Sequence, residues 1–232
     1  MARQHGTTMR GRIGNIIFYQ WKGTGYAKGA PHRVKQSMRT RQSAKDFGHA
    51  VQLSRYLRVS LLYALPNYKS RGIMYKMNAA LLSWLRQPVP IEENISFVGL
   101  ELNDKSLFSS KFRKALLIDF SAKGKLIITV PALKIPNDIV APSNTASVRL
   151  DFAVAGTMLR WPQNMGSSAA SIEIPYNDGW MDAITKELEF DCKEGALNVV
   201  AVSLHYTCKF GRVREITDER WTPAAIVAAV MA

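Results

Sequence analysis

The chain has 232 residues, of which 47% are hydrophobic and 21% are charged. This composition supports a buried core and excludes a disordered chain, and no apolar run is long enough to cross a bilayer as a helix. The formal net charge is +13, with an isoelectric point of about 9.9, and the positive charge is distributed unevenly along the chain.

The basic residues are concentrated in the first third of the sequence. Residues 1–90 contain 16 Lys and Arg residues and one acid, Asp46, which gives +15, whereas the rest contains 15 bases and 17 acids, which gives −2. This asymmetry predicts a polyanionic partner, namely nucleic acid, an anionic membrane surface or an acidic protein surface. The alternative is a solvated basic face that only aids solubility.

Residues 1–40 are predicted to form a basic, glycine-rich arm. The aromatic and β-branched run Ile16–Trp21 predicts a strand, Lys22–Gly25 a turn, and Tyr26–Lys28 a short returning strand. Residues 31–40 are expected to be extended. Because the arm has six glycines and no sustained apolar period, we expect residues 1–35 to be poorly ordered in an isolated monomer.

Residues 41–90 predict a helical hairpin with a basic outer surface. The first helix, 41–65, is expected to start at a cap formed by Ser37 or Thr40 and to turn Arg55 and Arg58 toward solvent or a partner. Its predicted apolar face consists of Phe47, Val51, Leu57, Leu61 and Ala64, widened by Leu53 and Leu65. The second helix, about 72–85, has apolar residues at helical spacing, namely Ile73, Met77, Leu81 and Trp84.

After Pro90 the hydrophobic period changes to two, which is typical of strands. The predicted strands are 95–102, 115–120, 125–130, 147–155, 171–174, 188–192 and 197–208. Within them, residues 148–154 alternate as a half-buried strand does, and the apolar tail 223–232 is left open as a strand, a helix or a docking segment. The predicted fold class is α+β, with residues 91–232 forming an antiparallel β-sandwich, immunoglobulin-like in general shape, that folds alone.

The arm also resembles a known group of sequences. The residues that carry the resemblance are Arg12-Ile13-Gly14-Asn15-Ile16-Ile17-Phe18-Tyr19, Trp21-Lys22-Gly23, Ala30-Pro31, Gln42 and Phe47. Over residues 10–60 the chain is similar to an uncharacterised domain family of Bacteroidota proteins. The resemblance implies a glycine-rich basic arm, a short helical region and a β-rich C-terminal half, and it implies no catalytic residue.

Motifs for catalysis, metals and cofactors are weak, so we predict a non-enzymatic protein without catalytic residues, metal or cofactor. The histidines are scattered, Cys192 and Cys208 lack the spacing of a zinc site, and nothing pairs the carboxylates for hydrolysis. The spacing of Gly23, Gly25 and Gly29 departs from the dinucleotide fingerprint. Whether Cys192 and Cys208 form a disulfide stays open.

The candidate binding residues are bases interleaved with aromatic side chains. Cations neutralise phosphates and aromatic rings stack on unpaired bases. The set is Arg10, Arg12, Lys22, Lys28, Arg33, Lys35, Arg39, Arg41, Lys45, Arg55, Arg58, Tyr19, Trp21 and Tyr26.

Two functional hypotheses follow from this set. In the first, the N-terminal module contacts the backbone of RNA or DNA. In the second, the chain is a structural, self-assembling subunit of a virion, filament or other large particle, with the arm lying on neighbouring subunits. Nucleic acid or another polyanion and copies of the chain itself are the expected partners, a membrane is not expected, and the expected location is the cytoplasm or a particle packaged from it.

Overall fold

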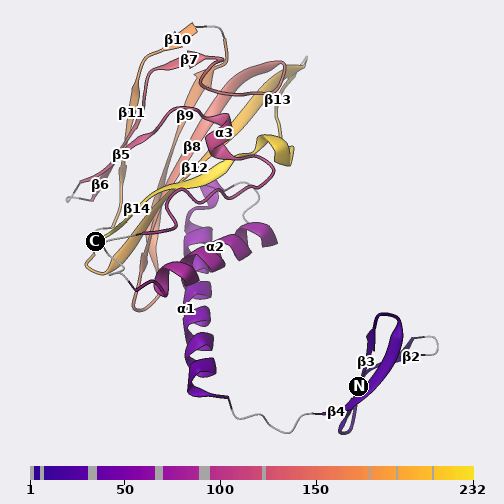
Figure 1. The fold of residues 1–232 in the computed structure, drawn as a ribbon. Helices are drawn as coiled ribbons and strands as arrows, with labels where there is room; N and C mark the ends of the chain where they lie inside the picture. Colours follow the sequence, from indigo (N-terminus) through magenta and orange to yellow (C-terminus); the bar gives the residue numbers. More distant parts are fainter. Residues whose placement is uncertain are drawn as a thin grey trace. The chain divides into compact units, whose positions relative to one another are not determined.

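The computed structural model describes residues 3–5, 8–30, 36–65, 70–88, 95–121, 124–177, 179–191, 193–210 and 212–232. The chain divides into two compact units, Met1–Ser43 and Ala44–Ala232. Helices accompany antiparallel sheets, which confirms the predicted α+β, sandwich-like fold class (Figure 1).

The N-terminal unit contains a four-stranded antiparallel sheet in chain order, which we call the arm sheet. Its strands are β1 (Arg3–His5), β2 (Thr8–Ile13), β3 (Ile16–Trp21) and β4 (Thr24–Gly29). The strand predicted over Ile16–Trp21 and its hairpin with the following segment are confirmed. The turn is tighter than predicted, because Lys22 (φ 48°) and Gly23 (φ 82°) alone make it, as in a type I′ turn.

Among its described side chains, the arm sheet has no buried core of its own. Every side chain described between Met9 and Ala30 is exposed or half-buried. A small sheet with neither face covered is only marginally stable in water. The arm sheet therefore requires contacts from outside the sheet to be stable. The expected poor order of residues 1–35 in an isolated monomer stays a prediction.

Two helices follow, α1 (Met38–Ser60) and α2 (Arg71–Leu85), with the 3₁₀ turn η1 (Leu62–Ala64) between them. The Ser37 hydroxyl accepts a hydrogen bond from the Thr40 backbone N–H at 3.1 Å, so the predicted cap is confirmed. The buried residues of α2 include all four predicted ones, Ile73, Met77, Leu81 and Trp84.

The predicted apolar face of the first helix is partly wrong. Phe47 is 52% exposed, because the buried stretch of α1 begins only at Ala50. Arg55 is exposed as predicted, whereas Arg58 is half-buried. The helix also starts earlier and ends earlier than predicted, at Met38 and Ser60.

A large antiparallel sheet dominates the C-terminal unit. Its strands are β8 (Thr145–Met158), β9 (Asn164–Pro175), β12 (Ala196–Phe210), β13 (Arg212–Glu215) and β14 (Ala224–Met231). β12 pairs with β8 along one edge, and β13 and β14 pair with different parts of its other edge. The C-terminal tail, left open by the sequence, is thus a strand.

A smaller sheet lies over one face of the large one. It has the order β11 (Ile184–Glu189), β6 (Lys125–Val130) and β5 (Leu117–Ser121), and β7 (Leu133–Ile135) pairs with β10 (Gly179–Met181) nearby. Two short helical turns, α3 (Phe108–Lys111) and η2 (Glu219–Trp221), complete the unit. The core between the sheets includes Ile128 of β6, Phe152 of β8 and Leu204 of β12.

The helices pack on the opposite face of the large sheet, so the unit has three layers (Figure 1). Ala153 of β8 and Val199 of β12 belong to the same buried cluster as Leu57 of α1 and Trp84 of α2. The predicted half-burial of residues 148–154 is therefore wrong from Leu150 onward, because both faces of β8 are covered.

The structure corrects several boundaries. Residues 95–102 form turns and one isolated bridge, Glu101 to Ala225, in place of the predicted strand. β11 spans 184–189 where 188–192 was predicted. The predicted boundaries after residues 40 and 90 also change, since the first compact unit ends at Ser43 and the helices share a core with the sheet.

Candidate nucleic-acid interface

The predicted binding residues fall into two groups. Those of the arm sheet are Arg10 and Arg12 on β2, Tyr19 and Trp21 on β3, Lys22 in the turn, and Tyr26 and Lys28 on β4. Those of α1 are Arg39, Arg41, Lys45, Arg55 and Arg58. Arg33 and Lys35 lie outside the described residues.

One face of the arm sheet gathers aromatic rings and a cation. Tyr19 and Tyr26 are direct cross-strand partners, and their rings stack with centroids 5.6 Å apart and planes 21° apart. The ammonium group of Lys28 lies 5.2 Å from the centroid of the Tyr19 ring. This is a cation–π contact, so the three side chains form one exposed unit.

The register places three more side chains on this face. Trp21 follows Tyr19 by two residues, and Ile17 precedes it by two, so both share its side of the sheet. Arg12 is the cross-strand partner of Ile17 on β2. We call this surface the aromatic face; it consists of Arg12, Ile17, Tyr19, Trp21, Tyr26 and Lys28.

Not all predicted residues join the aromatic face. Arg10 donates a hydrogen bond at 2.5 Å to the side chain of Gln20, which points to the other side of β3. Arg12 donates at 2.7 Å to the carbonyl of Gly14 through its Nε, which holds its side chain near the hairpin turn. The sequence pattern identified the members of the face except Ile17, whose place follows only from the register.

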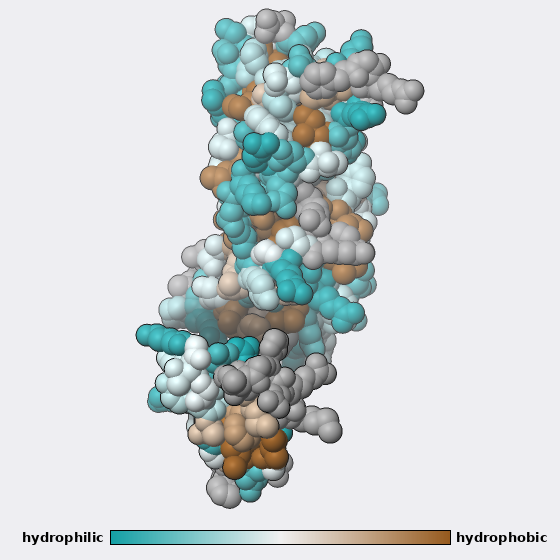
Figure 2. Space-filling view, turned by 90° about the vertical axis from the view of Figure 1, so that its right-hand side faces the viewer, coloured by the Kyte–Doolittle hydropathy of each residue, from teal (hydrophilic) through white to brown (hydrophobic). Residues whose placement is uncertain are grey.

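The opposite face of the arm sheet, which also carries Gln20, has an apolar area beside the turn between β2 and β3. Ile13 and Ile16 are cross-strand partners and are 52% and 47% exposed, and Phe18 lies between Gly11 and Ala27 on the same side. Figure 2 shows hydrophobic residues, in brown, at the surface in several separate places on the face in view. An uncovered apolar face of this kind is typical of a protein–protein contact.

The bases of α1 are exposed where the helix is least covered. Arg39, Arg41 and Lys45 are all exposed and precede the first buried residue of the helix. Burial and the neighbouring charge of Arg55 lower the pKa of Arg58, whose Nε lies 3.4 Å from the Ser54 hydroxyl. Arg58 is therefore a less accessible phosphate ligand than the bases at the start of the helix.

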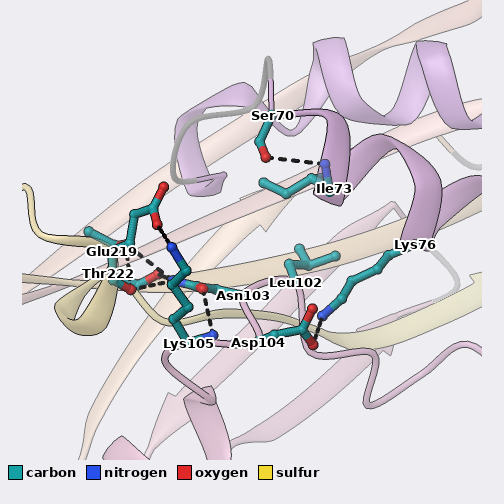
Figure 3. Close-up of a pocket in the computed structure, with 10 residues that line it drawn as sticks. Ser70, Ile73, Lys76, Leu102, Asn103, Asp104, Lys105, Glu219 and Thr222 are labelled. Carbon is teal, nitrogen blue, oxygen red and sulfur yellow. Dashed lines mark hydrogen bonds and ion pairs between the residues drawn. The ribbon is translucent and has the colours of Figure 1, made fainter. Parts of the chain in front are cut away.

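A pocket at the start of α2 has paired charges on its walls (Figure 3). Its volume is about 260 Å³. Lys76 forms an ion pair with Asp104 at 2.5 Å, and Lys105 forms one with Glu219. Each of these charges has a partner within the protein, so they serve to join α2, the following loop and η2.

A second polar cluster has the serine–histidine–acid arrangement of a hydrolytic triad. The Ser203 hydroxyl lies 3.0 Å from Nε2 of His205, and Nδ1 of His205 lies 2.6 Å from Glu215. Ser203, however, is fully buried, so no substrate reaches its oxygen. Nε2 also lies 3.3 Å from Asp151, a carboxylate that is 2% exposed.

This cluster is a structural ion-pair network. Arg149 donates to both oxygens of Asp151 at 3.0 and 3.1 Å, and that hydrogen bonding raises the pKa of the guanidinium. The network joins β8 and β12 to β13 through Glu215. Alternation along β8 and β12 places Arg149, Asp151, Ser203 and His205 on one face of the sheet. Glu215 reaches them only because β13 pairs with β12.

We expect Asp151→Asn to destabilise the protein by about 1.5–3 kcal/mol, because it weakens the charge-assisted hydrogen bonds that buried Asp151 accepts from Arg149. Urea unfolding of both proteins would measure this difference. Asp182→Asn is the matched control. Because Asp182 is exposed, its replacement should leave the urea midpoint unchanged. An equal midpoint for the two variants would contradict a stabilising role for the network.

Other classes of site find no support among the described residues. No group of three or more His, Cys, Asp or Glu side chains there could hold a metal ion, and no described helix is long and apolar enough to cross a membrane. Cys208 is buried with a free thiol, and Cys192 lies outside the described residues.

No family model, curated protein or solved structure matches the chain.

Proposed function

We propose that this chain is a non-enzymatic nucleic-acid-binding protein whose basic N-terminal module contacts the phosphate backbone. The observation that carries the proposal is the exposed, uncompensated charge of this module. Residues 1–43 contain nine Lys and Arg residues and no acid. The described bases from Arg10 to Arg41 are all exposed, so they are available to phosphates.

The contrast with the C-terminal unit supports the same proposal. There, Lys76, Lys105 and Lys125 each form an ion pair with a carboxylate. A base already paired with a carboxylate gains little from a phosphate, because the new contact replaces an existing one. Bases without acidic neighbours instead bind phosphates and release the counterions condensed on nucleic acid.

Replacing Lys22, Lys28, Arg39 and Arg41 by Ala together is expected to weaken nucleic-acid binding and to make it less sensitive to salt. The slope of log affinity against log salt concentration should decrease by about 3–4, close to one for each phosphate contact removed. Fluorescence anisotropy with labelled RNA and DNA over a range of salt concentrations would measure this slope.

The matched control replaces four exposed bases of the C-terminal unit, Arg160, Lys186, Lys209 and Arg214. It removes the same net charge, so a general effect of protein charge would weaken both variants equally. The proposal requires a loss confined to the N-terminal variant. If wild-type protein binds neither RNA nor DNA at low salt, nucleic-acid binding is not the function.

A second candidate function is structural assembly, and the apolar face of the arm sheet favours it. Ile13, Ile16 and Phe18 lie together on a sheet that lacks a core, so contact with a neighbouring subunit would supply the missing cover. Light scattering after nuclease treatment distinguishes the two candidates. A discrete large particle that persists without nucleic acid favours assembly, and loss of all large species favours nucleic-acid binding.

A further inference from the structure

We infer that the aromatic face selects single-stranded over duplex nucleic acid by stacking unpaired bases on its rings. This inference rests on the proposed function and names the class of nucleic acid that the arm sheet binds. It is carried by the juxtaposition of Trp21, Tyr26 and Lys28 on one open face.

The rings of this face are accessible where a base would stack. Trp21 is 63% exposed and Tyr26 is 44% exposed, while Tyr19 lies between the ring of Tyr26 and the ammonium group of Lys28. Tyr19 therefore supports the other groups, and Trp21 and Tyr26 present the open ring surface. The face of an exposed aromatic ring stacks on any base, because every base has a π surface.

The spacing of the rings suits a chain of bases. Tyr26 is the cross-strand partner of Tyr19, and Trp21 lies two residues beyond Tyr19 on β3, so the two open rings belong to diagonal neighbours about 7–8 Å apart. This is about two steps of stacked bases, each about 3.4 Å. A single strand can therefore pass across β3 and β4 with its bases on the rings of Trp21 and Tyr26.

The cations lie where the backbone of such a strand would run. Lys28 is two residues from Tyr26 on β4, and Arg12 lies on β2 at the same end of the face. Stacking and phosphate contact are thus available on one surface. In a duplex the bases are paired and stacked on each other, so only the phosphate contacts remain.

The test compares labelled oligo(dT) of ~20 nucleotides, longer than the 4–16 nucleotides of typical single-strand sites, with a duplex of the same length. Wild-type protein should bind the single strand more tightly. In the full chain, Trp21→Leu with Tyr26→Leu should reduce oligo(dT) affinity at least about tenfold, because each lost stack contributes to single-strand binding. Duplex affinity and its salt slope should stay unchanged.

Two further variants separate stacking from folding of the arm. Trp21→Phe with Tyr26→Phe keeps both rings and should retain oligo(dT) affinity. Trp161→Leu with Tyr75→Leu removes one Trp and one Tyr that are 74% and 62% exposed in the C-terminal unit, and should have no effect. Retained oligo(dT) affinity in the Leu variant, or equal loss for duplex and single strand, would overturn the inference.

These outcomes are distinguishable from failure of the proposed function. If wild-type protein binds duplex and oligo(dT) equally and the Leu variant behaves like wild type, backbone binding stands and base stacking is excluded. If the wild-type protein binds neither probe at low salt, the proposed function fails and this inference fails with it.

Discussion

A chain that starts at residue 91 is expected to fail to fold, whereas one that starts at Ala44 is expected to fold cooperatively. The reason is that α1 and α2 cover one face of the large sheet, and their removal exposes its apolar side chains. Leu197, Val199 and Ile226 are each at most 2% exposed on that face. Burial of these three alone contributes about 5–9 kcal/mol, comparable with the whole stability of many domains.

The chain from Ala44 keeps every buried residue of α1, because the first of them is Ala50. Circular dichroism and urea unfolding of the two fragments would test the difference. The 91–232 fragment should aggregate or lack a cooperative transition, while the 44–232 fragment should match the full chain. A sharp transition in the shorter fragment would show that the helices are dispensable for the sheet.

The sequence pattern predicted instead that residues 91–232 fold without the helices, and the reason for this difference is physical. Alternation along residues 148–154 indicates one apolar face, but small residues such as Ala153 and Ala155 give little sign that the second face is buried too. Alanine fits beneath a closely packed helix and contributes little to a hydrophobic period. The two helices could therefore be predicted from the sequence, but their packing on β8 and β12 could not.

Local features were predicted more accurately than pairings between distant parts of the chain. The strand Ile16–Trp21, the cap at Ser37 and the buried stripe of α2 all depend on residues close in sequence, and all are confirmed. The stacking of Tyr19 on Tyr26 depends on a two-residue turn that sets the register. Residues 95–102 show the limit of prediction from local pattern. Their hydrophobic period of two predicts a strand, but the structure has turns there.

The aromatic face illustrates the same difference at the candidate site. Its bases and aromatic rings could be chosen from composition, but composition does not separate residues on the two sides of a sheet. The register does so, and it places Arg12 and Lys28 with the rings. The apolar side chains of Ile13 and Ile16 fall on the opposite face, where they favour a protein contact.

Trp84→Ala is expected to destabilise the protein by about 3–5 kcal/mol, a large fraction of the stability of a typical domain. Trp84 is fully buried, and its ring meets that of Phe97 edge to face with centroids 5.3 Å apart. Truncation would leave a cavity between α2 and the segment that leads into the β-rich half. In a unit of this size the melting temperature should fall by about 10 °C.

Trp161→Ala is the matched control, because it truncates the same residue type at a position that is 74% exposed. It should shift the stability by less than about 0.5 kcal/mol. Urea midpoints and m-values of both variants measure the comparison, since an unchanged m-value shows that stability alone has changed. Equal midpoints for the two variants would mean that α2 is not anchored through Trp84. A large effect confined to Trp84→Ala would show that the burial of this side chain, and not the residue type alone, stabilises the unit.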